Sequence, residues 1–210
     1  MASSTARPVI AITGTSGAGK GTLEQELMRR MPELELAVSA TTRERRPTER
    51  DGREYHFVSE EEFERLVQAG AFLEHVTHPW GPRHGTLRSE IDRIRAAGRV
   101  PLLDLETHGA LVVRDEVPGA VTVFVKAPTM AELERRLRER ATESGGEIEE
   151  RVAVARGQLA LEHEFDHVIV NDDLYRAVDE LEDIVRRELR WASKDESDPV
   201  DRSLQTDARA

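Results

Sequence analysis

Apolar residues along the chain follow two patterns, short uninterrupted runs and longer segments with one apolar face. The uninterrupted runs predict strands buried on both faces; they cover residues 8–13, 100–105, 120–125 and 167–171. The one-faced segments predict amphipathic helices; they cover residues 22–30, 59–70, 87–97, 129–140, 148–159 and 174–185. Because strands and helices alternate, the pattern predicts an α/β fold whose mostly parallel sheet is flanked by helices.

Capping residues support two of these helices. Ser59 is followed by Glu62, and Thr129 by Glu132, which is the spacing of a capping box. Pro101 is compatible with the strand over 100–105 only near its start or at a sheet edge.

Three segments depart from the main pattern. Residues 39–58 are rich in Thr and Arg and predict a small antiparallel insert. Residues 193–210 have almost no apolar content and are expected to be disordered. Residues 1–7 are expected to be a flexible N-terminus, so the pattern predicts one domain over 8–192.

The composition narrows the function classes. The chain has 210 residues, a net charge of −11 and no cysteine, which excludes disulfides, thiolate metal sites and a cysteine nucleophile. A general nucleic-acid binder usually has the opposite charge, and no apolar run is long enough to span a bilayer. We therefore expect a cytoplasmic protein without nucleic-acid or membrane partners, in which any polyanion site is a local basic cluster.

A glycine-rich loop follows the first strand. Gly14, Gly19 and Lys20 match the pattern G-x-x-x-x-G-K between a buried strand and a helix. Such a loop turns backbone N–H groups toward an anion, the helix N-terminus adds positive charge, and the lysine reaches the outer phosphates. The loop therefore predicts ATP binding by nine consecutive residues: Gly14, Thr15, Ser16, Gly17, Ala18, Gly19, Lys20, Gly21 and Thr22.

The residue after the lysine departs from this pattern. A serine or threonine that ligates Mg²⁺ is expected there, but the chain has Gly21 followed by Thr22. We therefore expect Mg²⁺ to be held mainly by phosphates and water, with Thr22 contacting a phosphate and no protein metal site. Gly-Thr after the lysine is common in nucleoside monophosphate kinases.

The expected basic cluster lies in residues 39–59. Five arginines alternate there with serine, threonine and tyrosine; they are Arg43, Arg45, Arg46, Arg50 and Arg53. Arginine forks combined with hydroxyls suit a phosphate dianion. A solvated charged loop is the simpler interpretation of the same residues.

With this segment the sequence resembles the guanylate kinase family. Residues 39–59 resemble that family's S-x-T-T-R-x-x-R…DG-x-x-Y-x-F-V-S stretch. Further segments resemble family motifs in the same order: FLEH at 72–75, GPRHGT at 81–86, LLDLETHGA at 102–110, LERRLRERATES at 133–144 and VIVNDDL at 168–174. The resemblance covers about residues 8–190 and implies a P-loop core with a GMP-binding insert (39–92) and a helical lid (138–155).

The resemblance implies roles for acceptor residues. Arg43, Arg46 and Tyr55 resemble residues that grip the GMP phosphate. Ser39, Glu74 and Thr86 resemble those that read guanine, and His84 and Gly85 fall within the same motif. A carboxylate at Glu74 suits guanine, whose N1–H and 2-amino group are donors, and does not suit the N1 acceptor of adenine.

The resemblance also implies the catalytic residues. Asp104 ends a buried strand, where open α/β sheets present ligand-facing groups, and it resembles the family's acidic residue near Mg²⁺ and the acceptor. Arg140 and Arg151 resemble lid arginines that close on the transferring phosphoryl group together with Lys20. Asn171 resembles a residue beside the ATP base.

Several positions differ from the family pattern. His84 replaces a tyrosine that donates to the GMP phosphate, and we expect the histidine to donate instead; alternatively His84 faces solvent and Arg83 binds the phosphate. Thr86 follows Glu74 by 12 positions, one more than expected, so the acceptor loop carries an insertion. Glu106 replaces an aspartate, and Thr15 replaces a proline.

Two histidine patterns suggest metal sites. HEFDH at 163–167 matches H-E-x-x-H, but His167 begins a predicted strand, so the two histidines do not share a helical face. His75, His78 and His84 lie in one loop, and such histidines are more often surface or acceptor-site residues than metal ligands.

The combined observations predict Mg²⁺-dependent phosphoryl transfer from ATP to GMP or dGMP. Two alternatives remain at this stage. One is a related kinase with another acceptor, such as ribose 1,5-bisphosphate, which the altered loop 76–84 suggests. The other is a non-catalytic guanylate-kinase-like binding module, although such modules tend to lose the phosphate loop.

Overall fold

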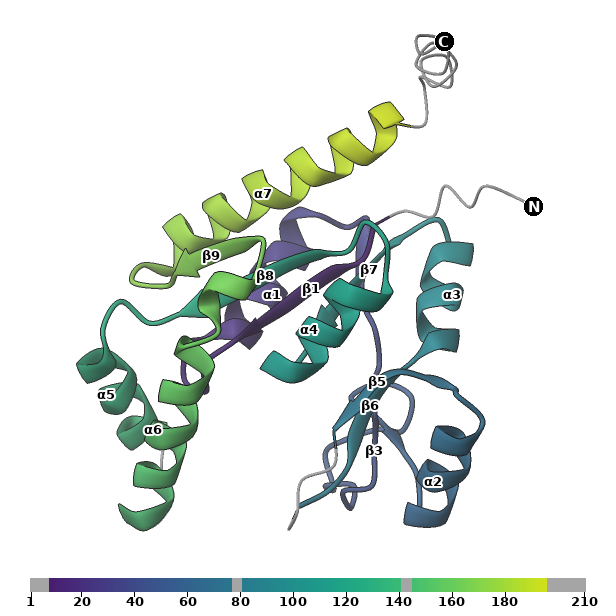
Figure 1. Cartoon of the computed structure of the whole chain (residues 1–210), viewed down its shortest axis with the longest axis horizontal. Helices are drawn as coiled ribbons and strands as arrows, with labels where there is room; N and C mark the ends of the chain where they lie inside the picture. Colours follow the sequence, from purple (N-terminus) through teal and green to yellow (C-terminus); the bar gives the residue numbers. More distant parts are fainter. Residues whose placement is uncertain (1–7, 77–80, 141–144, 196–210) are drawn as a thin grey trace, which may run out of the picture.

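The core of the protein is a five-stranded parallel sheet. The computed structural model describes residues 8–76, 81–140 and 145–195. The strands follow the spatial order β2-β7-β1-β8-β9 (Figure 1). Their bounds are Ile10–Gly14 (β1), Leu34–Leu36 (β2), Val100–Asp104 (β7), Val121–Lys126 (β8) and His167–Val170 (β9). Since β1 lies at the centre, the phosphate loop leaves the middle of the sheet.

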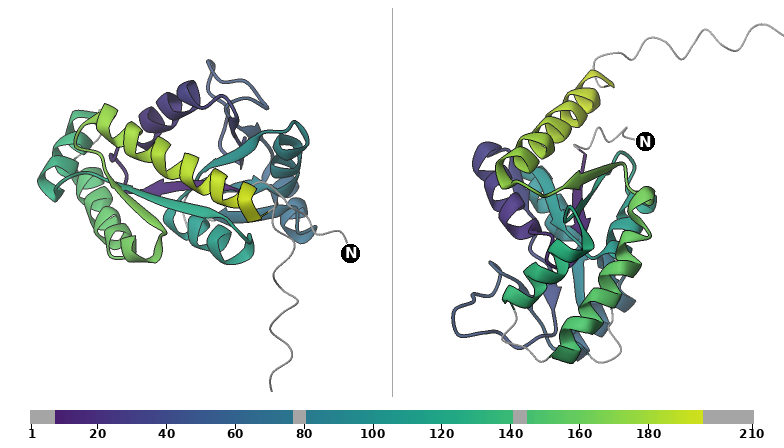
Figure 2. Two further views of the ribbon diagram at one scale, coloured as in Figure 1. Left: turned by 90° about the horizontal axis from the view of Figure 1, so that it is seen from above. Right: turned by 90° about the vertical axis from the view of Figure 1, so that its left-hand side faces the viewer.

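Helices cover both faces of this sheet (Figure 2). On one face lie α1 (Lys20–Arg30) and α7 (Leu174–Asp195), and on the other lie α3 (Arg88–Ala96) and α4 (Thr107–Glu116). Successive β1 side chains point to opposite faces, so Ile10 and Ile12 join the first core cluster and Ala11 joins the second. Both clusters are apolar, which explains why β1 has no polar alternation.

A second sheet lies beyond the core and contains the predicted insert. Its order is β4-β3-β6-β5, with bounds Ala40–Thr41 (β3), His56–Phe57 (β4), Phe72–Val76 (β5) and His84–Leu87 (β6). Helix α2 (Glu60–Gln68) packs against it, with Phe63 stacked on Phe72 at 4.5 Å between ring centroids. The sheet is mixed rather than antiparallel as expected, because β3 and β4 pair in parallel across the long intervening loop.

The predicted lid is formed by two helices. They are α5 (Met130–Arg140) and α6 (Gly145–Leu159), followed by the 3-10 turn η1 (Glu162–Glu164). Leu133, Leu137 and Ala155 pack together between them. In Figure 1 this helix pair and the second sheet extend from the core on the same side, at opposite ends. None of the described helices is both long and apolar enough to cross a membrane.

The predicted elements are found, and the predicted α/β class is confirmed. Both capping predictions are also confirmed, since the Ser59 and Thr129 hydroxyls accept from the backbone N–H groups three residues later, each at 3.1 Å. Pro101 is the second residue of β7, near the strand start as required. Strands β2, β5 and β6 and helix α4 were not predicted. Helix α7 runs to Asp195, three residues into the predicted tail, and residues 196–210 and 1–7 lie outside the described part.

Gly14 is the position where a side chain would most disturb this core. Its φ is +146°, and a Cβ there would lie 2.0 Å from the Val125 carbonyl oxygen on β8. We predict that Gly14→Ala lowers the free energy of unfolding by more than about 2 kcal/mol, since both strands must shift. Urea unfolding measures this loss. Gly157→Ala, in open space on α6, serves as the control and should change stability by less than about 1 kcal/mol.

Candidate active site

The glycine loop connects β1 to α1 in the geometry of an anion cradle. Gly19 is the N-cap of α1 and has φ +89°, a left-handed conformation that favours glycine. The side-chain amide of Asn171, just after β9, donates to the Ala18 carbonyl at 2.7 Å. A Cβ at Gly19 would lie 2.6 Å from that amide nitrogen, so glycine permits the contact. The loop is therefore fixed both by β1 and by the residue that follows β9.

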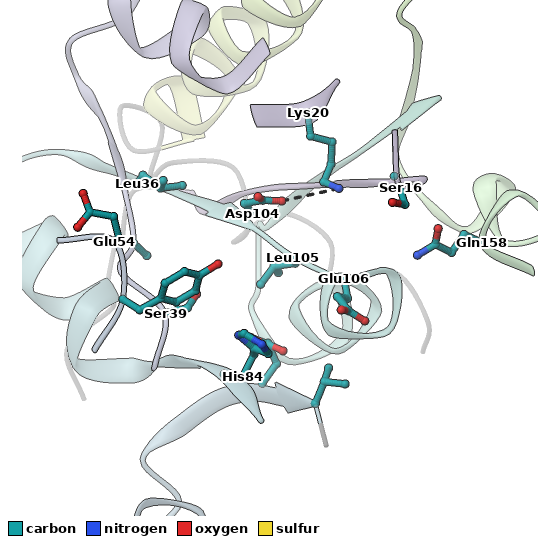
Figure 3. A pocket seen from close by; sticks show the side chains of 16 residues that line it. Ser16, Lys20, Leu36, Ser39, Glu54, His84, Asp104, Leu105, Glu106 and Gln158 are labelled. Atoms are coloured by element: carbon teal, nitrogen blue, oxygen red, sulfur yellow. Dashed lines mark ion pairs between the residues drawn. The ribbon is translucent and has the colours of Figure 1, made fainter. Parts of the chain in front are cut away.

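A cleft of about 380 Å³ lies between the loop and the second sheet (Figure 3). Its volume is in the range of small-molecule sites. Nine of the predicted site residues line it: Gly14, Ser16, Lys20, Ser39, Tyr55, Glu74, His84, Gly85 and Asp104. The lining also includes Glu54, Glu106 and Gln158, to which the sequence reasoning gave no role. Phosphate-loop residues and acceptor residues thus face one space.

Lys20 and Asp104 face each other in the cleft. Lys20 Nζ lies 4.0 Å from Asp104 Oδ1, drawn as the dashed line in Figure 3. Desolvation in the cleft raises the pKa of the Asp104 carboxyl, and the charge of Glu106 adds to this while Lys20 opposes it. The side chain is nevertheless 46% exposed, so it remains available to a ligand.

A second carboxyl, Glu24, lies close to this pair. It is one helical turn after Lys20 and only 3% exposed, and its Oε1 has no hydrogen-bond partner among the described residues. Burial raises the pKa of Glu24 to about 8, the Asp104 charge adds to the rise, and Lys20 opposes it. The sequence carried a signal for it, because Glu24 lies between Leu23 and Leu27 on the buried face of α1.

Glu74 and Thr86 are brought together on adjacent strands. Glu74 Oε1 accepts from the Thr86 backbone N–H at 2.9 Å and from the Thr86 hydroxyl at 2.8 Å. Both residues are buried. Burial raises the pKa of the Glu74 carboxyl, while the two hydrogen bonds from Thr86 lower it and the Glu106 charge raises it further. With Oε1 oriented by Thr86, Oε2 is the oxygen left for an outside donor.

The arginine-rich segment forms a loop organised by Glu49. Arg43 Nη2 donates to Glu49 Oε1 at 2.7 Å, and the Arg46 backbone N–H donates to Glu49 Oε2 at 2.8 Å. The Arg43 guanidinium also lies 5.5 Å from the centre of the Tyr55 ring. Within the described part of the chain, neither arginine lines the cleft. Because Arg43 is paired with Glu49, a phosphate in the cleft would compete with Glu49 for it.

His84 and Arg83 point to different places. The His84 ring lines the cleft and lies 5.8 Å from the Tyr55 ring centre. Arg83 Nη1 donates to Glu64 Oε2 at 3.0 Å, and its guanidinium lies 4.4 Å from the centre of the Phe63 ring. Arg83 is therefore held against α2, and His84 is the better placed of the two to meet a phosphate.

Arg151 and Asn171 do not line the cleft. Arg151 is exposed on α6, and the side chain of Arg140 lies outside the described part. Asn171 holds the phosphate loop, and Arg136 Nη2 donates to the Asn171 carbonyl at 3.0 Å. The catalytic roles of Arg140 and Arg151 and the base contact of Asn171 stay predictions.

The two histidine patterns occupy separate surroundings. His163 lies in η1, whereas His167 begins β9 and its Nε2 is 3.2 Å from Glu188 Oε1, so they share no helical face. His78 lies outside the described residues. Within the described ranges, no group of three or more His, Cys, Asp or Glu side chains is placed to hold a metal ion.

Comparison with known proteins places this architecture in a family. A family model described as guanylate kinase matches residues 5–188. The chain belongs to the guanylate kinase family. A guanylate kinase of Thermosynechococcus vestitus is 46% identical over 184 residues, covering 87% of this chain and 96% of the relative. A guanylate kinase of Aromatoleum aromaticum is 46% identical over 193 residues, covering 90% and 92%.

A solved structure agrees with this membership. The crystal structure of guanylate kinase from Anaplasma phagocytophilum matches with a TM-score of 0.69 and 27% identity, covering 87% of this chain and 86% of that one. The guanylate kinase resemblance inferred from the sequence is therefore confirmed, and the match includes both the phosphate loop and the second sheet.

Glu24 gives this guanylate kinase family member a testable dependence on pH. Between its ordinary pKa of 4.5 and its folded pKa of about 8, Glu24 ionises in the unfolded chain but stays protonated in the folded one. The folded state therefore loses stability as pH rises through this window. We predict that Glu24→Gln raises the free energy of unfolding at about pH 9 by a few kcal/mol relative to wild type.

Urea unfolding at about pH 5 and pH 9 measures this effect. Glu26→Gln, on the partly exposed side of α1, is the control; hydrogen bonds from Arg29 and Arg30 hold the pKa of Glu26 near 2, so it does not titrate in this range. A wild-type-like pH dependence in Glu24→Gln would show that folding does not raise the pKa of Glu24.

Proposed function

We propose that this protein transfers the γ-phosphoryl group of ATP to GMP or dGMP, giving ADP and GDP. One observation carries the proposal: the buried carboxylate of Glu74, oriented by Thr86, lines the same cleft as Lys20 of the phosphate loop. A donor site and a guanine-selective acceptor site then share one cleft. Because both substrates are intracellular metabolites, we place the activity in the cytoplasm.

The donor side follows from the phosphate loop. Helix α1 begins at Lys20, which lines the cleft. The free N–H groups of the helix N-terminus and the lysine ammonium therefore attract the ATP phosphates. Asp104 is half-exposed 4.0 Å from that ammonium, and its oxygen ligand suits a hard cation that enters with the nucleotide. Mg²⁺, when bound, would neutralise charge on the phosphate oxygens.

The acceptor side follows from Glu74. Guanine presents two adjacent donors, N1–H and the 2-amino group, and Glu74 Oε2 is left for them once Thr86 holds Oε1. These donors stabilise the ionised carboxylate against the burial that raises its pKa. Adenine has an acceptor at N1. In the same position, this nitrogen would face the Glu74 carboxylate, which is also an acceptor, so AMP should be rejected.

The acceptor phosphate would be held by the arginine loop and its neighbours. Tyr55 and His84 line the cleft beside each other, and Arg43 lies over the Tyr55 ring. A phosphate dianion would exchange the Arg43–Glu49 ion pair for a bidentate Arg–phosphate pair, and Arg46 would join it. We propose that Arg140 and Arg151 then close from α5 and α6, excluding water while stabilising the transferring charge.

A coupled assay that follows ADP release tests this function. GMP and dGMP should support turnover, whereas AMP and ribose 1,5-bisphosphate should support little. Turnover with the sugar phosphate in preference to GMP would show that the altered loop 76–84 has changed the acceptor. GMP binding without turnover under all conditions would instead indicate a binding module.

Removing the Lys20 ammonium should slow the chemical step. We predict that Lys20→Ala lowers kcat by roughly 100-fold or more, since one preorganised charge on the transferring group is lost. Lys126→Ala, which removes a lysine paired with Glu162 at 2.7 Å, is the control and should retain wild-type kcat. Near-normal turnover in Lys20→Ala would contradict the role of the phosphate loop.

Replacing the guanine-reading carboxylate should weaken GMP selectively. We predict that Glu74→Gln lowers kcat/KM for GMP by roughly 10- to 100-fold, because an amide cannot accept at both positions and leaves a donor mismatched. The KM for ATP should change by less than about twofold. Steady-state kinetics with each substrate varied in turn measure both quantities, and an unchanged GMP profile would mean that guanine is not read at Glu74.

A further inference from the structure

A buried carboxylate lies where the acceptor sheet joins the core. Residues 37–39 lead from β2 of the core sheet to β3 of the second sheet, and β6 leads back into α3. Glu90 is in the first turn of α3 and is only 7% exposed. It therefore lies beside both of these connections, outside the cleft described above.

Both oxygens of Glu90 have close partners. Oε2 accepts from the Val38 backbone N–H at 3.2 Å and from Arg93 Nη2 at 2.9 Å. Oε1 accepts from Arg93 Nε at 3.1 Å and lies 3.5 Å from His56 Nε2. That histidine nitrogen is buried and has no hydrogen-bond partner among the described residues. Glu90 thus joins the linker to its own helix by hydrogen bonds and lies against His56 of β4.

The same cluster is anchored in the core sheet. Arg93 Nη1 donates to Glu35 Oε1 at 2.7 Å, and Arg99 Nη1 donates to Glu35 Oε2 at 3.2 Å. Glu35 belongs to β2, which pairs with β7. A continuous chain of ion pairs and hydrogen bonds therefore runs from the core sheet through α3 to Val38 in the linker that enters the second sheet.

The residues held by Glu90 are direct neighbours of residues that line the cleft. Val38 precedes Ser39, and His56 follows Tyr55. The two positions are also joined to each other, since the His56 backbone N–H donates to the Ser39 carbonyl at 2.9 Å. Displacing Val38 or His56 would therefore shift one side of the acceptor site without touching the phosphate loop.

We propose that Glu90 is a positioning residue for the acceptor nucleotide. By fixing the linker against α3, with His56 of β4 hydrogen-bonded in turn to Ser39, it holds Ser39 and Tyr55 in the orientation that GMP requires. This inference rests on the proposed function, because it assigns Ser39 and Tyr55 to the acceptor. It concerns the acceptor alone and leaves the ATP side unchanged.

The charge state of Glu90 supports this role. Burial raises its pKa, but hydrogen bonds from Arg93 and from the Val38 backbone, with the Arg93 charge, outweigh burial and leave the pKa lowered. Glu90 is consequently ionised at neutral pH. A buried anion with these donors makes stronger, more directional contacts than a neutral group would.

Glu90→Gln and Glu90→Ala test the proposal in the full-length enzyme. Glutamine keeps an acceptor of the same shape but loses the charge, whereas alanine removes the contacts. We expect KM for GMP to rise roughly 10-fold in Glu90→Gln and further in Glu90→Ala, as for loss of charged hydrogen bonds. KM for ATP should stay within about twofold of wild type in both variants, because the phosphate loop is not involved.

Glu62→Gln is a matched control. Glu62 is the third residue of α2 as Glu90 is of α3, and it pairs with the arginine three positions on, but it contacts no linker. Its KM for GMP should equal that of wild type. Thermal unfolding of each variant separates a change in positioning from a loss of folded protein, and if Glu90→Ala does not fold, Glu90→Gln decides.

Two results would overturn the proposal. One is a KM for GMP in Glu90→Gln equal to that of Glu62→Gln. The other is an equal rise in the KM values for GMP and ATP together with a lower melting temperature, which indicates a purely structural role. Wild-type enzyme that does not phosphorylate GMP would instead reject the proposed function, and with it the acceptor role of Glu90.

Discussion

The close approach of β1 and β8 at Gly14 is the contact on which the site depends. Gly14 is paired with Val125, leaving no space for a side chain, and the Thr15 N–H donates to the Val125 carbonyl at 3.2 Å. The chain therefore leaves the sheet centre as a tight loop and enters α1 at Lys20. Since β7 flanks β1 on its other side with Ile12 paired to Asp104, lysine and aspartate meet at the same edge.

The electrostatics of the cleft depend on one lysine that lies among several carboxyls. Lys20 faces the carboxyl of Asp104, while Glu74 and Glu106 line the same cleft, and the buried Glu24 lies one helical turn after Lys20. Burial raises the pKa of Glu24 to about 8, with the Asp104 charge adding to the rise, so Glu24 is protonated below that pH. A carboxyl held neutral beneath the lysine leaves the ammonium charge available to a phosphate instead of neutralising it.

Much of this architecture could be predicted from the sequence, because its signals are local. The phosphate loop, the buried strands and the two capping boxes each depend on residues close together in the chain. The mixed second sheet, strand β2 and helix α4 were missed or misassigned, since a two- or three-residue strand has no readable alternation and its pairing is set by distant partners. The burial of Glu24 could have been read from its place between Leu23 and Leu27, but its proximity to Asp104 arises only in the fold. Glu90 was missed because its contacts with Val38 and His56 join segments that are distant in the sequence.

We propose that one cleft joins an ATP phosphate loop to a guanine-reading acceptor site. Phosphorus-31 NMR of the protein with ATP, Mg²⁺ and GMP tests it most directly, because each phosphate is identified by its own resonance. The account predicts that the γ-phosphate signal of ATP disappears while the β-phosphate signals of ADP and GDP appear in equal amounts. Appearance of inorganic phosphate with ADP and no GDP would contradict it.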